Sequence, residues 1–241
     1  MTLFVTSSPY IDGAPKAILS NRNQFVDRIR ECLPENPRVV FVASDPDDHS
    51  GTCSFAAETC MAFLEAGIPF SRYEVLTGKT AAHGYGMISH SDLVVLSGGH
   101  VPTQNEFFQE IHLKELLENY QGVILGISAG TMNAAARVYA QPEEAGESVP
   151  EFRRFLPGLG ITHVNVLPHY QQVKDYMLDG KRLFEDVTYA DSYGERFFVF
   201  VDGTYLLIED DQTFLYGQAY RLQDGQMEQI SELGDIVVIE E

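Results

Sequence analysis

The sequence predicts an α/β fold, in which a mostly parallel β-sheet carries helices on both faces and is finished by antiparallel C-terminal hairpins. Two observations support this prediction. Over residues 38–139, short apolar runs alternate with segments of helical spacing, and such strand–helix–strand units build parallel sheets through right-handed crossovers. Over the last third of the chain, strand-like runs follow one another with only short turn signals between them, which is typical of hairpins.

The first part of the chain contains the elements of the parallel sheet. Apolar runs rich in β-branched residues predict buried strands at 38–44, 69–77, 92–99 and 122–128. Apolar residues at helical spacing predict helices at 50–67, 104–120 and 129–139. Gly67 stands where the first of these helices is expected to stop.

The last third of the chain predicts an antiparallel ribbon. Residues 160–170 resemble a strand, and later strand-like runs are separated by Asp202-Gly203, Asp210-Asp211 and Asp224-Gly225. Asp-Gly between apolar runs is a strong signal for a tight hairpin turn. No linker rich in Pro, Gly or Ser interrupts the chain, so we expect a single domain over residues 1–241.

Composition excludes several classes of partner and compartment. The 241 residues include 16 Lys and Arg against 35 Asp and Glu, a formal charge of -19. Such a surface repels nucleic acid phosphates and anionic lipids, so neither nucleic acid nor a membrane is expected as a partner. Three cysteines, no leader peptide and no apolar run of roughly 20 residues predict free thiols in a cytoplasmic protein.

The stretch QGVILGISAGTMNAAA at 121–136 predicts an exposed nucleophile. An apolar strand ends in Gly126, Ser128 and Gly130 and passes directly into small, helix-forming residues. A serine on a sharp strand–turn–helix bend is held away from the sheet, and the N–H groups of the following helix face the same space. The alternative is that Ser128 only caps the helix.

A serine needs a base to take its proton, and we expect that base to be His169. This histidine ends the predicted strand 160–170, on the same rim of the sheet as Ser128. The alternative is a capping or surface histidine. An ordinary α/β-hydrolase does not fit, because only 41 residues separate the two and the rest of the chain resembles hairpins.

The acidic loop at 44–51 raises the question of a metal. It carries three aspartates and His49, and hard cations prefer such oxygen ligands. No distant set of ligands accompanies the loop, and such loops more often cap the next helix, here through Asp48 or Ser50. We therefore expect neither a metal nor any other cofactor.

Three segments together resemble the peptidase E family of serine peptidases, which also contains the cyanophycinases. They are LSGGHVPTQNEFF at 96–108, GISAGTMNAAA at 126–136 and VLPHY at 166–170, in an order and spacing similar to those of the family. The resemblance extends over about residues 38–170 and implies a fold like that of the class I glutamine amidotransferases, with serine in place of cysteine at the bend.

The resemblance implies a role for each matched residue. Ser128 corresponds to the nucleophile and His169 to the base, and the backbone N–H groups of Gly99 and Ala129 correspond to the oxyanion hole. A glycine suits that place because it has no Cβ to obstruct a substrate carbonyl.

The remaining roles rest on looser correspondences. The acidic residue of the triad is expected shortly after the bend helix, at Glu143, with Glu144 and Glu147 as alternatives. His100 stands where the family has asparagine and is expected to contact substrate. Arg182, with Lys181 beside it, falls close to the place of the basic residue that binds an acidic substrate side chain in the family's aspartyl dipeptidases.

These observations predict a serine peptidase that hydrolyses short peptides, as a dipeptidase or other exopeptidase, through a Ser-His-acid triad and an acyl-enzyme. Two alternatives stay open: a cyanophycinase-like or other amidase or acyl transferase on the same scaffold, and a non-catalytic member that binds a small molecule. The expected partner is a short peptide substrate, and a homodimer is left open.

Overall fold

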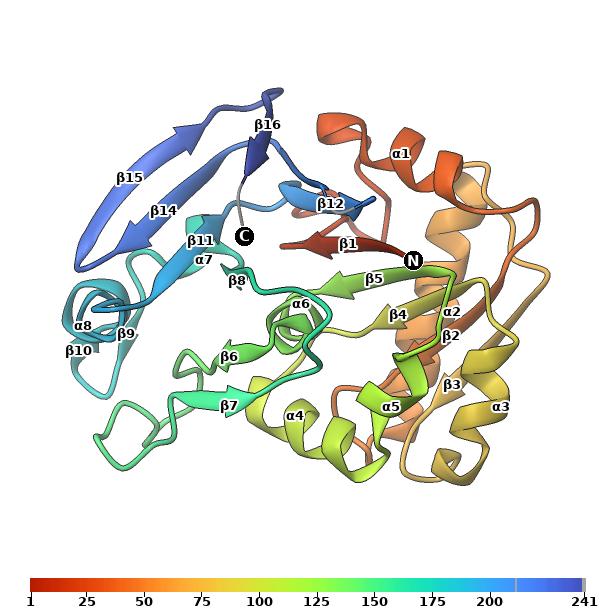
Figure 1. Cartoon of the computed structure of the whole chain (residues 1–241), viewed down its shortest axis with the longest axis horizontal. Helices are drawn as coiled ribbons and strands as arrows, with labels where there is room; N and C mark the ends of the chain where they lie inside the picture. The colour runs from red at the N-terminus through yellow and green to blue at the C-terminus, as the bar shows by residue number, and fades with distance from the viewer. Residues whose placement is uncertain (211, 240–241) are drawn as a thin grey trace.

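The computed structural model describes residues 1–210 and 212–239, so Asp211 of the second predicted turn lies outside the described residues. Within them, eight strands form one large sheet and four form a second sheet (Figure 1). The large sheet contains, in spatial order, β16 (Ile236–Ile239), β13 (Gln212–Tyr216), β12 (Tyr205–Glu209), β1 (Thr2–Thr6), β5 (Val123–Ile127), β4 (Leu93–Leu96), β2 (Arg38–Val42) and β3 (Arg72–Leu76). The second sheet contains β15 (Gln226–Ser231), β14 (Ala219–Gln223), β11 (Arg196–Phe200) and β8 (Asn165–Leu167).

The predicted fold class is confirmed. The strands from β1 through β5, β4 and β2 to β3 are parallel, and β12, β13 and β16 continue the same sheet in antiparallel register. The described helices are α1 (Phe25–Cys32), α2 (His49–Glu65), α3 (Gly84–Ser89), α4 (Val101–Glu110), α5 (Leu113–Leu117), α6 (Ala129–Ala134), α7 (Tyr170–Val173) and α8 (Tyr189–Asp191), with further short helical turns at Arg22–Gln24, Ala81–His83 and Leu183–Thr188.

The large sheet is buried on both faces because its strands alternate their side chains between two cores. In β1, Leu3 and Val5 pack in one core with residues of α4 and α5, whereas Phe4 packs in the other with residues of α1 and α2. The near-continuous apolar strands found in the sequence follow from this arrangement.

Two of the predicted helices are shorter in the structure. The segment 104–120 divides into α4 and α5 because His112 adopts a left-handed conformation, with φ 51°. The segment 129–139 is helical only to Ala134. Ala135 is extended and the chain then continues as β6 (Arg137–Tyr139), which pairs with β7 (Phe155–Pro157).

The C-terminal strands are divided between the two sheets. Asp224-Gly225 forms the predicted hairpin turn between β14 and β15, with φ of 51° and 73°. Asp202-Gly203 does not form a hairpin, because β11 before it belongs to the second sheet and β12 after it belongs to the large sheet. The chain crosses between the sheets at this point, which brings Asp202 to the site described below.

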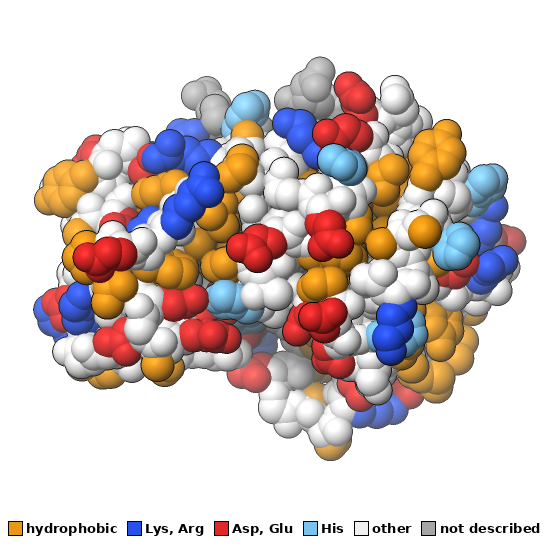
Figure 2. Space-filling model, turned by 90° about the horizontal axis from the view of Figure 1, so that it is seen from below, with side chains coloured by type: hydrophobic (Ala, Val, Ile, Leu, Met, Phe, Trp, Pro, Cys, Tyr) orange, Lys and Arg blue, Asp and Glu red, His pale blue; other side chains and the backbone are white. Residues whose placement is uncertain are grey.

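Surface charge, the cysteines and the acidic loop before α2 can be compared with the sequence predictions. Acidic side chains are spread over the face seen in Figure 2, among fewer basic ones. Cys32, Cys53 and Cys60 are free thiols, and Asp48 caps α2 by accepting a hydrogen bond from the N–H of Gly51 at 2.8 Å. Within the described ranges, none of the helices combines the length and the apolar character needed to cross a bilayer.

Candidate active site

Ser128 lies on a strained bend between β5 and α6. Its φ of 52° and ψ of -113° are rarely adopted by a residue with a Cβ and cost on the order of 1–3 kcal/mol. Its backbone N–H donates to the carbonyl oxygens of Thr6 and Ser7, which fixes the bend against the end of β1. The Ser128 side chain makes no capping hydrogen bond to α6, so its hydroxyl can bond to another side chain.

The glycine at 130 allows α6 to lie close to the sheet. A Cβ built on Gly130 would stand 2.2 Å from the carbonyl oxygen of Leu96, at the end of β4. Only a residue without a side chain permits this approach. The bend at Ser128 and the short helix behind it are therefore specified by the local sequence.

His169 lies beside Ser128, as the sequence predicted. It follows β8, has a left-handed conformation with φ 59°, and precedes α7. Its Nε2 is 2.9 Å from the Oγ of Ser128, and its Nδ1 is 2.7 Å from the Oδ1 of Asp202. Because an ionised carboxylate only accepts, Nδ1–H donates to Asp202, and Nε2 then accepts from the serine hydroxyl.

The carboxylate on His169 is not the one expected from the sequence. We expected Glu143, with Glu144 or Glu147 as alternatives, and the structure places Asp202 there instead. The physical reason is the pairing of strands. β8 and β11 are parallel neighbours, so His169 and Asp202, which follow them, lie at the same edge of the second sheet although 33 residues separate them.

A signal for Asp202 was present in the sequence. An acidic residue directly after an apolar strand lies at the carboxyl edge of a sheet, where ligands bind in α/β folds. The Asp202-Gly203 pair suggested a hairpin turn instead, and only the pairing of β11 with β8 shows that it faces His169.

Asp202 is held firmly by further hydrogen bonds. Ser7 donates its hydroxyl to Oδ1 at 2.7 Å, and Gln171 and Gln172 donate their amides to Oδ2 at 2.5 and 2.8 Å. Burial alone would raise the pKa of Asp202, but the hydrogen bond and charge of His169 and the other donors outweigh it and hold the pKa below its usual value. Asp202 is therefore ionised at neutral pH.

Ser7 joins the two sheets at the site. It is fully buried directly after β1, and its Oγ accepts from the backbone N–H of His169 at 2.8 Å while donating to Asp202. One hydroxyl therefore fixes both the backbone of the histidine and the carboxylate.

The proposed oxyanion donors flank the serine. A Cβ on Gly98 would lie 3.3 Å from the Ser128 Cβ and 3.9 Å from its Oγ, so the turn at Gly98 and Gly99 passes directly beside the hydroxyl. Gly99 has φ 153°, and a Cβ there would meet the Ser44 side chain at 2.4 Å. Ala129 opens α6, where the first N–H groups of a helix have no partner within the helix.

A cavity of about 230 Å³ opens beside Ser128 and His169. Its remaining walls are apolar except for Gln141 and Glu143. The lining residues are Ser128, Met132, Gln141, Pro142, Glu143, Pro168, His169, Val173, Tyr176 and Leu183. Glu143 thus lies at the site, on the cavity wall, and not on the ring of His169.

Glu143 is exposed by surface area, yet protein atoms crowd its carboxyl group. This desolvation raises its pKa to about 7, which His100 opposes and the charge of Glu147 reinforces.

His100 and Glu147 are paired with each other. The His100 Nε2 is 2.9 Å from Glu147 Oε1, and the other carboxylate oxygen accepts from the N–H groups of Glu143 and Glu144. His100, Glu144 and Glu147 place possible ligand atoms within 4.8 Å of one another. The hydrogen bonds of Glu147 hold the loop that carries Glu143.

The predicted basic residues do not reach the cavity. The Nε and Nη2 of Arg182 bind the Asp186 carboxylate at 3.1 and 2.6 Å on the exposed surface. Lys181 donates its Nζ to the carbonyl oxygen of Ser148 at 2.6 Å. The neighbouring Leu183 lines the cavity in their place.

Comparison with known proteins assigns the chain to a family. The sequence model of peptidase family S51 matches residues 4–216. The chain belongs to peptidase family S51. This membership supports a serine peptidase, and the elbow at Ser128 with the histidine beside it has the arrangement that such an enzyme requires.

Two solved structures share the fold of this S51 chain. One is a peptidase from an acI-B1 Actinobacterium, with a TM-score of 0.65 and 15% identity over 99% of this chain and 96% of that chain. The other is a putative peptidase E protein from Listeria monocytogenes EGD-e, with a TM-score of 0.60 and 15% identity over 95% of this chain and 98% of that chain. A search of curated proteins gave no match.

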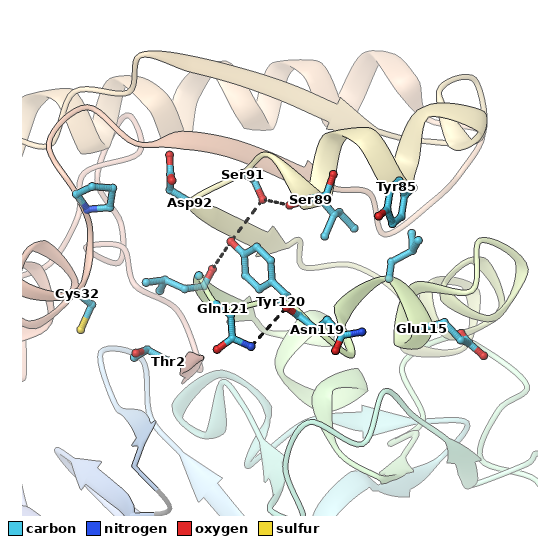
Figure 3. A pocket seen from close by; sticks show the side chains of 15 residues that line it. Thr2, Cys32, Tyr85, Ser89, Ser91, Asp92, Glu115, Asn119, Tyr120 and Gln121 are labelled. Atoms are coloured by element: carbon cyan, nitrogen blue, oxygen red, sulfur yellow. Dashed lines mark hydrogen bonds between the residues drawn. The ribbon is translucent and has the colours of Figure 1, made fainter.

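A larger cavity of the S51 chain, of about 650 Å³, lies at the amino ends of strands of the large sheet, whereas Ser128 follows the carboxyl end of β5. Figure 3 shows Tyr120 among its lining residues, with hydrogen bonds of 3.4 Å linking its hydroxyl to Ser91 and to the carbonyl of Val123. Thr2 and Asp92, at the starts of β1 and β4, also line it. It contains no histidine and no pair of groups suited to acyl transfer, so the smaller cavity is the candidate active site.

Proposed function

We propose that this chain is a serine exopeptidase that hydrolyses short peptides through an acyl-enzyme, with Ser128, His169 and Asp202 as its triad. One observation carries the proposal: His169 bonds the Ser128 hydroxyl through one ring nitrogen and the Asp202 carboxylate through the other. That is the geometry of a nucleophile with its base and the group that orients the base.

In the acylation step, the Ser128 Oγ attacks the scissile carbonyl carbon while His169 Nε2 takes the hydroxyl proton. A C–O bond forms, and the electron pair of the C=O bond moves to oxygen. The N–H groups of Gly99 and Ala129 stabilise this oxyanion, and each such donor is worth about 3 kcal/mol of barrier. The C–N bond then breaks, and His169 gives its proton to the departing amine.

In the deacylation step, His169 takes a proton from water and the resulting hydroxide attacks the ester carbon. The Ser128 oxygen leaves and recovers the proton from His169, and the new carboxylic acid is released. Asp202 stays ionised throughout and stabilises the imidazolium that forms in both steps. No cofactor takes part.

The size of the cavity limits how much of a substrate it can hold. At about 230 Å³ it is smaller than the roughly 300–1,000 Å³ typical of pockets for larger ligands. It therefore suits the side chain of one residue before the scissile bond.

Peptide hydrolysis tests this function. The wild-type chain should cleave unprotected dipeptides and tripeptides and leave the same bond intact inside a longer peptide blocked at both ends. Ser128→Ala should cleave neither. Equal hydrolysis by Ser128→Ala contradicts the proposed nucleophile, and cleavage of internal bonds contradicts the exopeptidase. Activity on an acidic polymer in place of short peptides would assign the cyanophycinase-like alternative.

A further inference from the structure

The cavity beside Ser128 has a distribution of charge and apolar surface that selects among substrates. Met132, Val173 and Leu183 contribute aliphatic wall, and two prolines and Tyr176 complete it. No lysine or arginine is among the lining residues. An acidic substrate side chain would therefore enter an apolar pocket without a cationic partner, which is unfavourable for a carboxylate.

The two basic residues that follow the cavity in sequence are already engaged. Arg182 binds Asp186 through two of its nitrogens and lies on the surface, and Lys181 binds a carbonyl oxygen. Bringing Arg182 into the cavity would break its ion pair with Asp186, and bringing Lys181 in would break its bond to the carbonyl oxygen of Ser148. The structure thus lacks a ready counter-ion for an acidic first residue.

The group on the wall that can carry a negative charge at neutral pH is a carboxylate. Glu143 faces the cavity from the loop that follows β6, and this loop is fixed by the pairing of Glu147 with His100 and with the Glu143 N–H. A carboxylate on a mainly apolar wall, in the same cavity as the nucleophile, matches a substrate with one ammonium group and an apolar body.

We infer that Glu143 binds the free α-ammonium group of the substrate, and that the apolar wall takes an uncharged side chain of the amino-terminal residue. This inference rests on the proposed function and names its substrate class: short peptides with a free amino end and an apolar first residue. The geometry agrees, because the α-nitrogen lies only two bonds from the scissile carbonyl carbon and must therefore lie close to Ser128.

The surroundings of Glu143 are consistent with this role. Desolvation raises the pKa of its carboxyl group to about 7, and the neighbouring groups that act on it are His100, His169, Glu144 and Glu147. An arriving ammonium group replaces the lost solvation of the carboxylate and favours its ionised form. Glu143 is then a specificity residue, which touches substrate but transfers no proton.

Kinetics with five p-nitroanilides test the inference: those of leucine, N-acetyl-leucine, aspartate, lysine and Nα-acetyl-lysine. The wild-type chain should prefer leucine with a free amine over its acetylated form. Glu143→Gln should lower kcat/KM for the free amine about tenfold, chiefly through KM, and leave the acetylated substrate unchanged. Glu151→Gln, with the same change of charge on an exposed residue of the same loop outside the cavity, should behave as wild type.

Three results would overturn the inference while leaving the peptidase intact. They are an unchanged preference for the free amine in Glu143→Gln, the fastest hydrolysis with aspartate, and hydrolysis of lysine at a rate set by Glu143 when the α-amine is acetylated. Labelling of Ser128 by a fluorophosphonate separates these from failure of the function. Labelling without amine preference defeats only the inference, and no labelling in the wild-type chain defeats both.

Discussion

The two halves of the active site are built on different sheets. The Ser128 half lies on the parallel part of the large sheet, where β4 ends in the glycine turn at 98–99 and β5 ends in the bend at Ser128. The His169 and Asp202 half lies on the second sheet, at the ends of β8 and β11. The serine bend can be recognised from neighbours in sequence, whereas the second half depends on strands that meet only in the folded chain.

This difference shows that the two halves need different amounts of the fold to be assembled. A strained serine on a tight bend needs only a few residues, whereas the pair that activates it needs the second sheet to dock on the first. Ser7, from the large sheet, bonds both members of that pair. Substitutions in each half can therefore measure separately the effects on activity of the nucleophile, of its base and of the contact between the two sheets.

The largest effect is expected from the Ser128 half. Ser128→Ala removes the nucleophile and should lower kcat by about 10⁶-fold. Its thermal unfolding midpoint should stay near that of the wild type, because the bend is held by backbone hydrogen bonds to Thr6 and Ser7. Steady-state kinetics and thermal unfolding followed by circular dichroism measure both. A variant that unfolds would show that the hydroxyl supports the fold.

The sequence was sufficient for the first half and, within the second, for His169 but not for Asp202. Gly126, Ser128 and Gly130 lie within five residues, so their turn could be recognised from spacing alone. The partner of His169 depends on β11 joining β8 in parallel, and the Asp-Gly at 202–203 resembled an ordinary hairpin turn. Long-range pairing of this kind has no local signature.

The splitting of the C-terminal strands between two sheets was missed for the same reason. The alternation of apolar residues shows that a segment is a strand, but both β11 and β12 satisfy it. Only the burial of each strand against different partners decides which sheet it joins. In contrast, Asp224-Gly225 was predicted correctly because the turn and its two strands are adjacent.

The link between the halves should show an intermediate effect. Ser7→Ala removes the acceptor of the His169 N–H and a donor to Asp202, and leaving a buried polar group unpaired costs about 1–3 kcal/mol. We expect a loss of kcat of roughly 10- to 100-fold, since about 1.4 kcal/mol of barrier is tenfold in rate. Ser8→Ala, one residue further along, is the control and should stay close to wild type. Equal kinetics of both variants would remove Ser7 from the positioning of the pair.

The packing of the elbow should appear in stability. Gly130→Ala places a Cβ against the Leu96 carbonyl and should destabilise the fold by about 1–3 kcal/mol. Gly86→Ala, in α3 with open space around the added Cβ, should stabilise it by about 0.5–1 kcal/mol. Urea unfolding of the two variants gives the difference. A Gly130→Ala chain as stable as wild type would mean that α6 can move away from β4.

The smallest effect concerns Glu143 and pH. The pKa of its carboxyl group is about 7 in the folded chain against an ordinary 4.5, so folding favours the protonated form. Its contribution to stability is present below about pH 4.5 and is lost as pH rises towards 7. As the pH rises from 5 to 8, the thermal unfolding midpoint of the wild type should therefore decrease relative to that of Glu143→Gln. A constant difference would show that Glu143 titrates normally.

The most direct test of the account compares the two carboxylates at the site. A fluorophosphonate reports the reactivity of Ser128 without needing the substrate amine, so its labelling rate can be measured in Asp202→Asn and in Glu143→Gln. If Asp202 holds and charges His169, the first variant should be labelled about 10⁴-fold more slowly than wild type and the second at nearly the wild-type rate. Normal labelling of Asp202→Asn together with a large loss in Glu143→Gln would contradict the account.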